Sequence, residues 1–248
     1  MSLPKVQEVE NYWRFELKYR LTFEQYLKVK NAIFPYIRYD SFTEAVPEHR
    51  YLVRSLYFDS LDYQSYNEKL GGDNFRYKFR IRTYCKTLDC DAAIRAEIKL
   101  RRGGKTEKYG AMVTPDSYCH FMKHYHWDCE GNPVLIEFER NLHAHVLRPK
   151  VLVEYHREGF RSRDKEDIRV TFDHSVRSAQ TKSLFPQTAF FRQHYPHHVI
   201  LEVKHRDQPP DWLSTIVQNQ GLKLETNSKY CQGIDITQSE LVNHALRV

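Results

Sequence analysis

The sequence predicts an α+β fold in which eight antiparallel strands form a closed β-barrel with helices around it. Two observations lead to this prediction. About eight segments place apolar residues at every second position, which is the period of a β-strand. Short connections, such as Gly103-Gly104 between residues 93–101 and 105–113, favour hairpins and hence an antiparallel sheet. A sheet of this size tends to close, because closure removes its unpaired edges.

The expected strands are recognised by their alternation. In the first of them, Phe15, Leu17 and Tyr19 alternate with charged residues. Such a strand presents one face to a core and the other to water or to a ligand. The expected strands cover residues 14–20, 51–59, 76–84, 93–101, 105–113, 151–157, 168–173 and 199–205.

Helices are expected between the strands, where apolar residues recur every three or four positions. Thr22 and Gln25 form a capping-box pattern at the start of the first helix. Ser60 is expected to cap a short helix that stops at Gly71-Gly72, and Gly221 to end the last helix. The longer expected helices cover residues 22–34, 116–125 and 134–147, and a further one starts at Pro209-Pro210-Asp211.

Composition and charge limit the classes of protein. The chain has 248 residues, which fits a single domain with a core at about residues 12–235. A formal charge of +6 is modest for a nucleic-acid binder, and no RNP-type aromatic motif is present, so no nucleic-acid partner is expected. The five cysteines are odd in number and lack metal-finger spacing, which indicates reduced thiols. The sequence thus predicts a cytoplasmic protein.

Neither a membrane segment nor a zinc site is expected. No apolar run approaches the ~20 residues that a transmembrane helix needs, and residues 1–10 lack the apolar core of a signal peptide. Direct membrane insertion is therefore not expected, while a membrane-protein partner stays open. His120 and His124, like His143 and His145, have the spacing of a ligand pair, but no Cys/His quartet completes either pair.

Three expected strands carry charged residues almost throughout one face. They include residues 14–20, 78–82 and 95–101. Arginine supplies a planar fork of donors that matches phosphate oxygens, and lysine supplies a compact charge. Neighbouring strands with such faces would repel one another unless an anion lay among them. A solvated sheet face is the alternative, but the repetition and the sign of the charge favour a polyanion site.

Eight short motifs, in one order along the chain, carry a family resemblance. They are Arg14-Phe15-Glu16-Leu17-Lys18-Tyr19, Ser55-Leu56-Tyr57-Phe58-Asp59, Phe79-Arg80-Ile81-Arg82, Glu97-Ile98-Lys99, Val153-Glu154-Tyr155-His156-Arg157-Glu158, Arg169-Val170-Thr171-Phe172-Asp173, Leu201-Glu202-Val203-Lys204 and Ser228-Lys229-Tyr230. This order resembles the vacuolar transporter chaperone (VTC) domain, the polyphosphate polymerase branch of the triphosphate tunnel metalloenzymes. The wider tunnel family begins with two glutamates and a lysine at alternate positions. Here Arg14 takes the first position, as expected in the polymerase branch.

The resemblance implies a tunnel that holds ATP with inorganic polyphosphate or triphosphate, and a divalent metal, Mn²⁺ or Mg²⁺. The side chains matched to phosphate contacts and catalysis are Lys18, Arg80, Arg82, Lys99, Arg157, Arg169, Lys204 and Lys229. Further substrate-binding residues are expected to be Glu16, Tyr155, Ser228, Arg20, Lys78 and Arg101. Glu202 would be the leading metal ligand, with Glu97 and Asp173 as further candidates. For each carboxylate the alternative is an ion pair that orients a neighbouring cation.

The expected reaction is a phosphoryl transfer. Such a reaction needs attacking and leaving oxygens in line and cations that neutralise the transferring group, but no protein nucleophile. The terminal phosphate of a growing polyphosphate would attack the γ-phosphate of ATP and release ADP. Water as the attacker would instead make the protein a tripolyphosphate or nucleoside triphosphate hydrolase. A polyphosphate-binding module without turnover is the third hypothesis.

Overall fold

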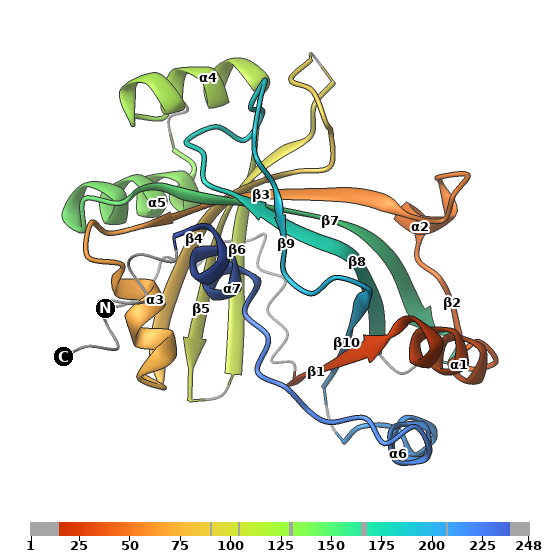
Figure 1. Ribbon diagram of the computed structural model, residues 1–248. Coiled ribbons are helices and arrows are strands. Elements are labelled where there is room, and N and C mark those ends of the chain that lie inside the picture. Colours follow the sequence, from red (N-terminus) through yellow and green to blue (C-terminus); the bar gives the residue numbers. More distant parts are fainter. Residues whose placement is uncertain are drawn as a thin grey trace.

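A computed structural model describes residues 15–89, 91–103, 105–128, 131–164, 168–206 and 208–238 of the chain. They form a ten-stranded antiparallel sheet with helices against both of its faces (Figure 1). The strands are β1 (Phe15–Thr22), β2 (Ile37–Tyr39), β3 (Tyr51–Asp59), β4 (Phe75–Thr83), β5 (Ile94–Arg102), β6 (Lys105–Val113), β7 (Arg148–Ser162), β8 (Arg169–Ala179), β9 (Arg192–Gln193) and β10 (His198–His205). The helices are α1 (Phe23–Ile33), α2 (Ser41–Glu44), α3 (Gln64–Leu70), α4 (Pro115–His124), α5 (Pro133–Ala144), α6 (Asp211–Asn219) and α7 (Lys229–Thr237). None of the helices in these ranges is long and apolar enough to cross a membrane.

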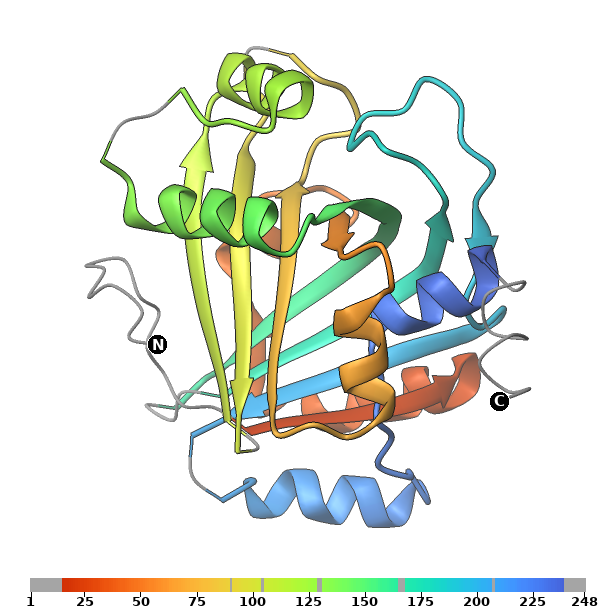
Figure 2. The ribbon, with the colours of Figure 1, turned by 90° about the vertical axis from the view of Figure 1, so that its left-hand side faces the viewer.

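The sheet is hydrogen-bonded in the order β1-β10-β8-β7-β3-β4-β5-β6, with β2 beside β7 and β9 beside β8. Every neighbouring pair of strands is antiparallel. The sheet curls strongly, so that β4, β5 and β6 cross the direction of β7, β8, β10 and β1 and face them from the other side (Figure 2). The predicted α+β class and the antiparallel sheet are confirmed.

The predicted closed barrel is wrong. β1 and β6 end the order of strands, and they do not pair with each other in the described part of the chain. A loop covers the free edge of β1 instead: Tyr19 forms an antiparallel bridge with Leu224, and the Glu225 amide donates to the Lys18 carbonyl at 2.9 Å. Closure of a barrel would leave no unpaired edge, and here hydrogen bonds from the loop cover the edge of β1 instead.

Helices cover the convex side of the sheet in two places (Figure 2), and an apolar core lies beneath each of them. One packs α4 and α5 on β3, β4 and β5, where the rings of Phe121 and Phe138 lie 5.8 Å apart. The other packs α1 and α6 on β1, β8 and β10, where Tyr26 meets Phe172 at 5.2 Å. Side chains of a strand alternate between its faces, so the charged members of these strands point to the concave side.

The capping box predicted for the first helix is confirmed, and at the third helix the Ser60 hydroxyl accepts the Gln64 amide at 2.9 Å. Thr22 accepts the Gln25 amide, and the Gln25 side chain accepts the Thr22 amide, which confirms the capping box. α3 begins at Gln64 and not directly after Ser60. The buried carboxylate of Asp59 accepts the next two amides of the first turn of α3, so it caps this helix together with Ser60.

The sequence predicts no helix where α7 lies, on the concave side of the sheet (Figure 1). The apolar residues Tyr230, Cys231 and Ile234 pack among side chains of β3, β7, β8 and β10. Gly233 permits this close approach, because a Cβ atom there would lie 2.8 Å from Ser178 Oγ. α7 therefore occupies part of the concave side, and its first residues face the charged remainder.

Candidate functional site

Strand register places the charged faces together on the concave side. On one wall, Arg80 of β4 lies between Tyr57 of β3 and Glu97 of β5. On the other wall, Lys18 of β1 lies opposite Glu202 of β10. Alternation alone predicts which face each side chain takes, and the pairing of the strands makes these residues neighbours.

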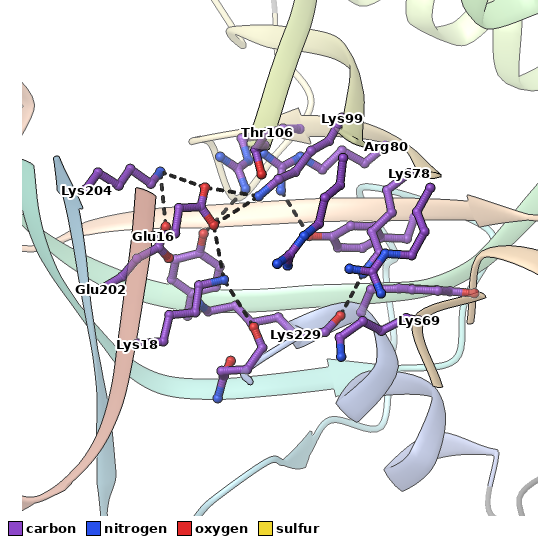
Figure 3. A pocket seen from close by; sticks show the side chains of 18 of the residues that line it. Glu16, Lys18, Lys69, Lys78, Arg80, Lys99, Thr106, Glu202, Lys204 and Lys229 are labelled. Atoms are coloured by element: carbon purple, nitrogen blue, oxygen red, sulfur yellow. Dashed lines mark hydrogen bonds and ion pairs between the residues drawn. The ribbon is translucent and has the colours of Figure 1, made fainter. Parts of the chain in front are cut away.

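Two adjoining cavities lie on this surface, and Figure 3 shows side chains that converge there. The first has a volume of about 160 Å³ and the second about 130 Å³. Eleven of the nineteen residues that line the first cavity are Lys or Arg, and two, Glu16 and Glu202, are carboxylates. The lining residues common to both cavities are Glu16, Arg80, Arg82, Lys99, Thr106, Arg157 and Lys204. Because the cavities share these residues, they form one basic channel.

Glu16 gathers three lysines in the channel (Figure 3). Its carboxylate accepts from Lys99 Nζ at 3.1 and 3.2 Å, and lies 3.5 Å from Lys18 Nζ and 4.0 Å from Lys204 Nζ. Burial raises the pKa of Glu16, but the three lysines outweigh it and hold this pKa well below its ordinary value. Burial and the neighbouring cations lower the pKa of Lys99 to about 8. The lysines are thus only partly neutralised by protein.

Glu97 orients Arg80 from behind the channel wall. It is buried, and it accepts from Arg80 Nε at 2.6 Å while Lys108 Nζ lies 2.5 Å from its other oxygen. Arg80 Nη1 also donates to the Tyr57 hydroxyl at 3.0 Å. Burial, together with Arg80 and Arg82, lowers the pKa of Lys108 to about 7. The guanidinium of Arg80 is thus held on two sides, through Nε and Nη1.

Asp173 orients Arg157 and Lys229 in the way that Glu97 orients Arg80. Arg157 donates from Nε and Nη2 to the two carboxylate oxygens at 2.6 and 2.9 Å, and Lys229 Nζ lies 2.6 Å away. Burial raises the pKa of Asp173, but these two cations lower it to about 2. The ring of Tyr155 lies 5.1 Å from the Arg157 guanidinium and 5.0 Å from Lys229 Nζ. Both cations are therefore fixed in the channel wall.

Glu202 is the carboxylate of β10 that faces the channel. Lys204 Nζ lies 3.1 Å from it. Burial raises its pKa, but Lys204, Lys18 and Lys229 hold that pKa well below the ordinary value. Glu202 is therefore ionised at neutral pH, and its oxygens can bind a cation.

Four cations of the first cavity make no ion pair with a carboxylate in the described part of the chain. They are Lys69 of α3, Arg76 and Lys78 of β4, and Arg101 of β5. Lys78 Nζ donates only to Ser228 Oγ, at 2.8 Å, among these residues. Burial lowers the pKa of Lys78, and burial with the neighbouring Arg101 lowers that of Arg76. Arg76 is the buried member of this set, and an unpaired buried charge destabilises a protein, so an anion bound beside Arg76 would stabilise this one.

Comparison with known domain families identifies the chain. The profile of the VTC domain matches residues 13–238, a range that includes every residue of the channel. The chain belongs to the VTC-domain family. The resemblance drawn from the eight motifs is thereby confirmed. A comparison with curated proteins found no match.

Two solved structures are similar to this VTC-domain chain at low sequence identity. A protein of Bacillus halodurans, provisionally assigned as an adenylate cyclase, is 13% identical with a TM-score of 0.54, over 88% of this chain and 94% of that one. A provisionally assigned adenylyl cyclase of Hippeastrum, described as having a dominant triphosphatase activity, is 13% identical with a TM-score of 0.49, over 90% of this chain and 95% of that one. The first likeness shows a shared fold.

Most of the predicted site residues of the VTC domain lie together in the channel. Those that line it are Glu16, Lys18, Lys78, Arg80, Arg82, Lys99, Arg101, Tyr155, Arg157, Arg169, Glu202, Lys204, Ser228 and Lys229. Glu97 and Asp173 lie behind the lining, where they hold its cations. Arg20 is not among the lining residues and instead donates to Glu225 at 2.9 Å. Arg14 lies outside the described residues.

Other lining residues were not selected from the sequence. Thr106 and Lys108 lie on β6, and Arg76 lies on β4. These residues share the faces of the other charged positions, so the same alternation could have found them. Lys69 on α3 and Asn227 before α7 carry no such signal, because only the approach of these two segments to the sheet brings them to the channel.

The channel fits a divalent metal that is held together with phosphate. Among residues whose placement is described, no three His, Cys, Asp or Glu side chains are placed to hold a metal ion. The predicted ligands Glu97 and Asp173 do not line the channel, and each of them holds two cations from behind its wall. Glu202 remains, with Glu16 on the neighbouring strand, and both line the channel. Mg²⁺ is usually bound by one or two carboxylates, with substrate phosphates and water as its other ligands, and these two carboxylates suit that arrangement.

Proposed function

We propose that this VTC-domain protein is a polyphosphate polymerase-like phosphotransferase, which transfers the γ-phosphate of ATP to a growing inorganic polyphosphate chain. The observation that carries the proposal is the basic channel, where eleven cations and two carboxylates line the first cavity alone. So many cations suit a chain of phosphates better than a singly charged substrate. The partners would be ATP and inorganic polyphosphate or triphosphate. We expect the reaction in the cytoplasm, where ATP is available.

The channel would bind phosphates through cations that are already oriented. Arg80 is held by Glu97 and Arg157 by Asp173, so neither guanidinium has to be ordered when a ligand arrives. Donors fixed in this way stabilise charge that develops on a transferring phosphoryl group. No protein nucleophile is needed, because the attacking oxygen belongs to the polyphosphate, and the protein aligns it with the leaving ADP.

The proposal includes a divalent cation, Mn²⁺ or Mg²⁺, held by Glu202 with Glu16 beside it. When bound, such an ion neutralises charge on the phosphate oxygens that it contacts. Lys204 lies 3.1 Å from Glu202 and helps to keep that carboxylate ionised. Lys18, opposite Glu202 on β1, would bind phosphate next to the ion.

Hydrolysis of tripolyphosphate or of a nucleoside triphosphate is the second candidate. The observation that favours it is the pair of ionised carboxylates, Glu16 and Glu202, in the channel lining. A carboxylate in such a position can orient a water molecule as the attacking group. The same cations would then bind the substrate, and only the attacker would differ.

Incubation of the purified protein with ATP and Mn²⁺ or Mg²⁺ tests the proposal. ADP together with long-chain polyphosphate would support the polymerase, and free phosphate without chain growth would support the hydrolase. Binding of polyphosphate without release of ADP or phosphate would overturn both and leave a binding module. Lys229→Ala should weaken triphosphate binding by about 1.5 to 3 kcal/mol. Lys28→Ala is its control, because Lys28 pairs with Glu24 on the exposed side of α1.

A further inference from the structure

Three aromatic side chains form a cluster at the second cavity, called here the aromatic rim. The ring centroids of Tyr51 and Tyr84 lie 5.9 Å apart, and that of Phe42 lies 6.1 and 6.2 Å from them. Tyr51 and Tyr84 line the cavity. Phe42 is 59% exposed and Tyr84 is 39% exposed, and their rings are within 20° of parallel. The aromatic rim therefore keeps ring surface open next to the channel.

The aromatic rim is anchored to a cation of the channel through Asp40. This residue caps α2, where its Oδ1 accepts the Thr43 amide at 2.9 Å, and its Oδ2 accepts from Arg169 Nη2 at 3.3 Å. Gly159 of β7 permits the approach, because a Cβ atom there would lie 2.2 Å from Asp40 Oδ2. Arg169 lines the second cavity. One carboxylate thus fixes both this cation and the helix that carries Phe42.

The opposite end of the channel offers charge without open aromatic surface. Tyr57, Tyr155 and Tyr230, the other tyrosines that line the channel, are 7%, 3% and 1% exposed. The cations that line only the first cavity include Lys69, Arg76, Lys78 and Arg101. Arg76 and Tyr84 are eight residues apart along β4 and its continuation, a separation of about 26 Å in an extended chain. The channel thus has an aromatic end and a basic end.

We propose that Phe42 and Tyr84 stack on the base of a nucleoside triphosphate, whose phosphates point inward to Arg157 and Arg82, and that inorganic polyphosphate occupies the basic end. Every nucleobase has a flat π-face that stacks on Phe or Tyr. Polyphosphate has no such face and needs cations alone. The inference rests on the proposed function, because it takes a triphosphate to be bound in the channel.

The test compares the binding of ATP with that of inorganic tripolyphosphate, measured by titration calorimetry without divalent metal so that no turnover is needed. The double variant Phe42→Leu/Tyr84→Leu removes both open rings. We expect it to bind ATP about five- to tenfold more weakly and tripolyphosphate as the wild type does. Tyr84→Phe keeps the ring and should bind ATP normally. Phe190→Leu is the matched control, since Phe190 is 96% exposed and does not line the channel.

Each remaining outcome decides against the inference. If the double variant binds ATP as tightly as the wild type while tripolyphosphate still binds, the base does not stack on these rings. If both ligands are weakened equally, the rings shape the phosphate site and do not contact a base. A wild-type protein that binds neither ligand would overturn the proposed function, and the stacking site with it.

Discussion

Lys99 of β5 and Glu16 of β1 join two strands that are not paired with each other in the described part of the chain. The ammonium group donates to both carboxylate oxygens, at 3.1 and 3.2 Å. β1 ends the order of strands on one side, and β5 is the last but one on the other. A side-chain ion pair therefore spans the opening where the barrel expected from the sequence would close. A polyanion in the channel would compete with the Glu16 carboxylate for the Lys99 ammonium group.

Glu16→Gln should lower the stability of the ligand-free protein and enlarge its response to a polyanion. The amide cannot neutralise the three lysines around it, so we expect the free energy of unfolding to fall by about 1 to 2 kcal/mol. Tripolyphosphate would neutralise the same lysines, so the rise in Tm that it causes without metal should exceed that of the wild type. Urea and thermal unfolding, with and without tripolyphosphate, measure both effects.

Glu24→Gln is the control for this substitution, because Glu24 pairs with Lys28 on the exposed surface of α1. It should change neither stability nor the response to tripolyphosphate by more than a few tenths of a kcal/mol. Equal Tm shifts in Glu16→Gln and the wild type would show that tripolyphosphate does not take over the role of the Glu16 carboxylate.

Tripolyphosphate should bind less tightly as the pH rises through 7 and 8. Burial with the neighbouring Arg80 and Arg82 lowers the pKa of Lys108 to about 7, and burial with nearby lysines lowers the pKa of Lys99 to about 8. Each lysine loses its charge above its pKa, and a bound anion favours the charged form, so binding takes up protons in this range. Calorimetry in buffers of different ionisation enthalpy measures the uptake. Lys108→Met should reduce it, and an undiminished uptake would assign the titration to another group.

The sequence predicts that a residue lines the channel when the alternation of side chains along a strand is enough to assign its face. Arg80, Arg82 and Lys99 could be assigned to one face because side chains of a strand alternate. The same rule cannot show what lies opposite, since register and curvature come from tertiary packing. The sequence therefore leaves Glu97 and Asp173 open between metal ligand and ion-pair partner, and the structure places each against two cations.

The elements that the sequence does not predict depend on distant contacts. α7 has a glycine, Gly233, in its middle, which disfavours a helix in isolation, yet this glycine allows the helix to pack closely on Ser178 and Val151. The closed barrel failed for a similar reason, because Leu224 reaches the edge of β1 from more than two hundred residues away in the chain. Neither contact leaves a local pattern in the sequence.

Glu202→Gln should keep the fold and remove metal-dependent turnover. Glutamine has nearly the same size but lacks the charge that holds a divalent ion, and Lys204 loses its partner at 3.1 Å. We expect kcat/KM to fall by about 100-fold or more, with an unchanged circular dichroism spectrum. Glu225→Gln, outside the channel lining, should keep full activity. If Glu202→Gln turns over substrate as fast as the wild type at any metal concentration, Glu202 is not a ligand of the metal.

Arg101→Ala should weaken polyphosphate binding, whereas Arg102→Ala should not. The two arginines are neighbours on β5 and point to opposite faces, and only Arg101 lines the channel. One phosphate contact from an exposed side chain should contribute about 1 kcal/mol, which is about fivefold in Kd. Binding of polyphosphate at moderate salt measures this difference. Equal losses in the two variants would indicate that net charge, and not the channel, governs binding.

Gly159→Ala should both destabilise the protein and disturb the aromatic end of the channel. A Cβ atom at this position would lie 2.2 Å from Asp40 Oδ2 and 2.7 Å from its Cγ, and Asp40 is buried, so the carboxylate has to move. Its movement would break the cap of α2 and the bond to Arg169, with an expected loss of about 1 to 3 kcal/mol in the free energy of unfolding. Gly71→Ala is the matched control, because a Cβ atom there would meet its nearest neighbours at 3.4 Å and the backbone is helical. Urea unfolding of both variants, combined with ATP binding, measures the effect. If Gly159→Ala unfolds and binds ATP as the wild type does, Asp40 is not the anchor that ties α2 to Arg169.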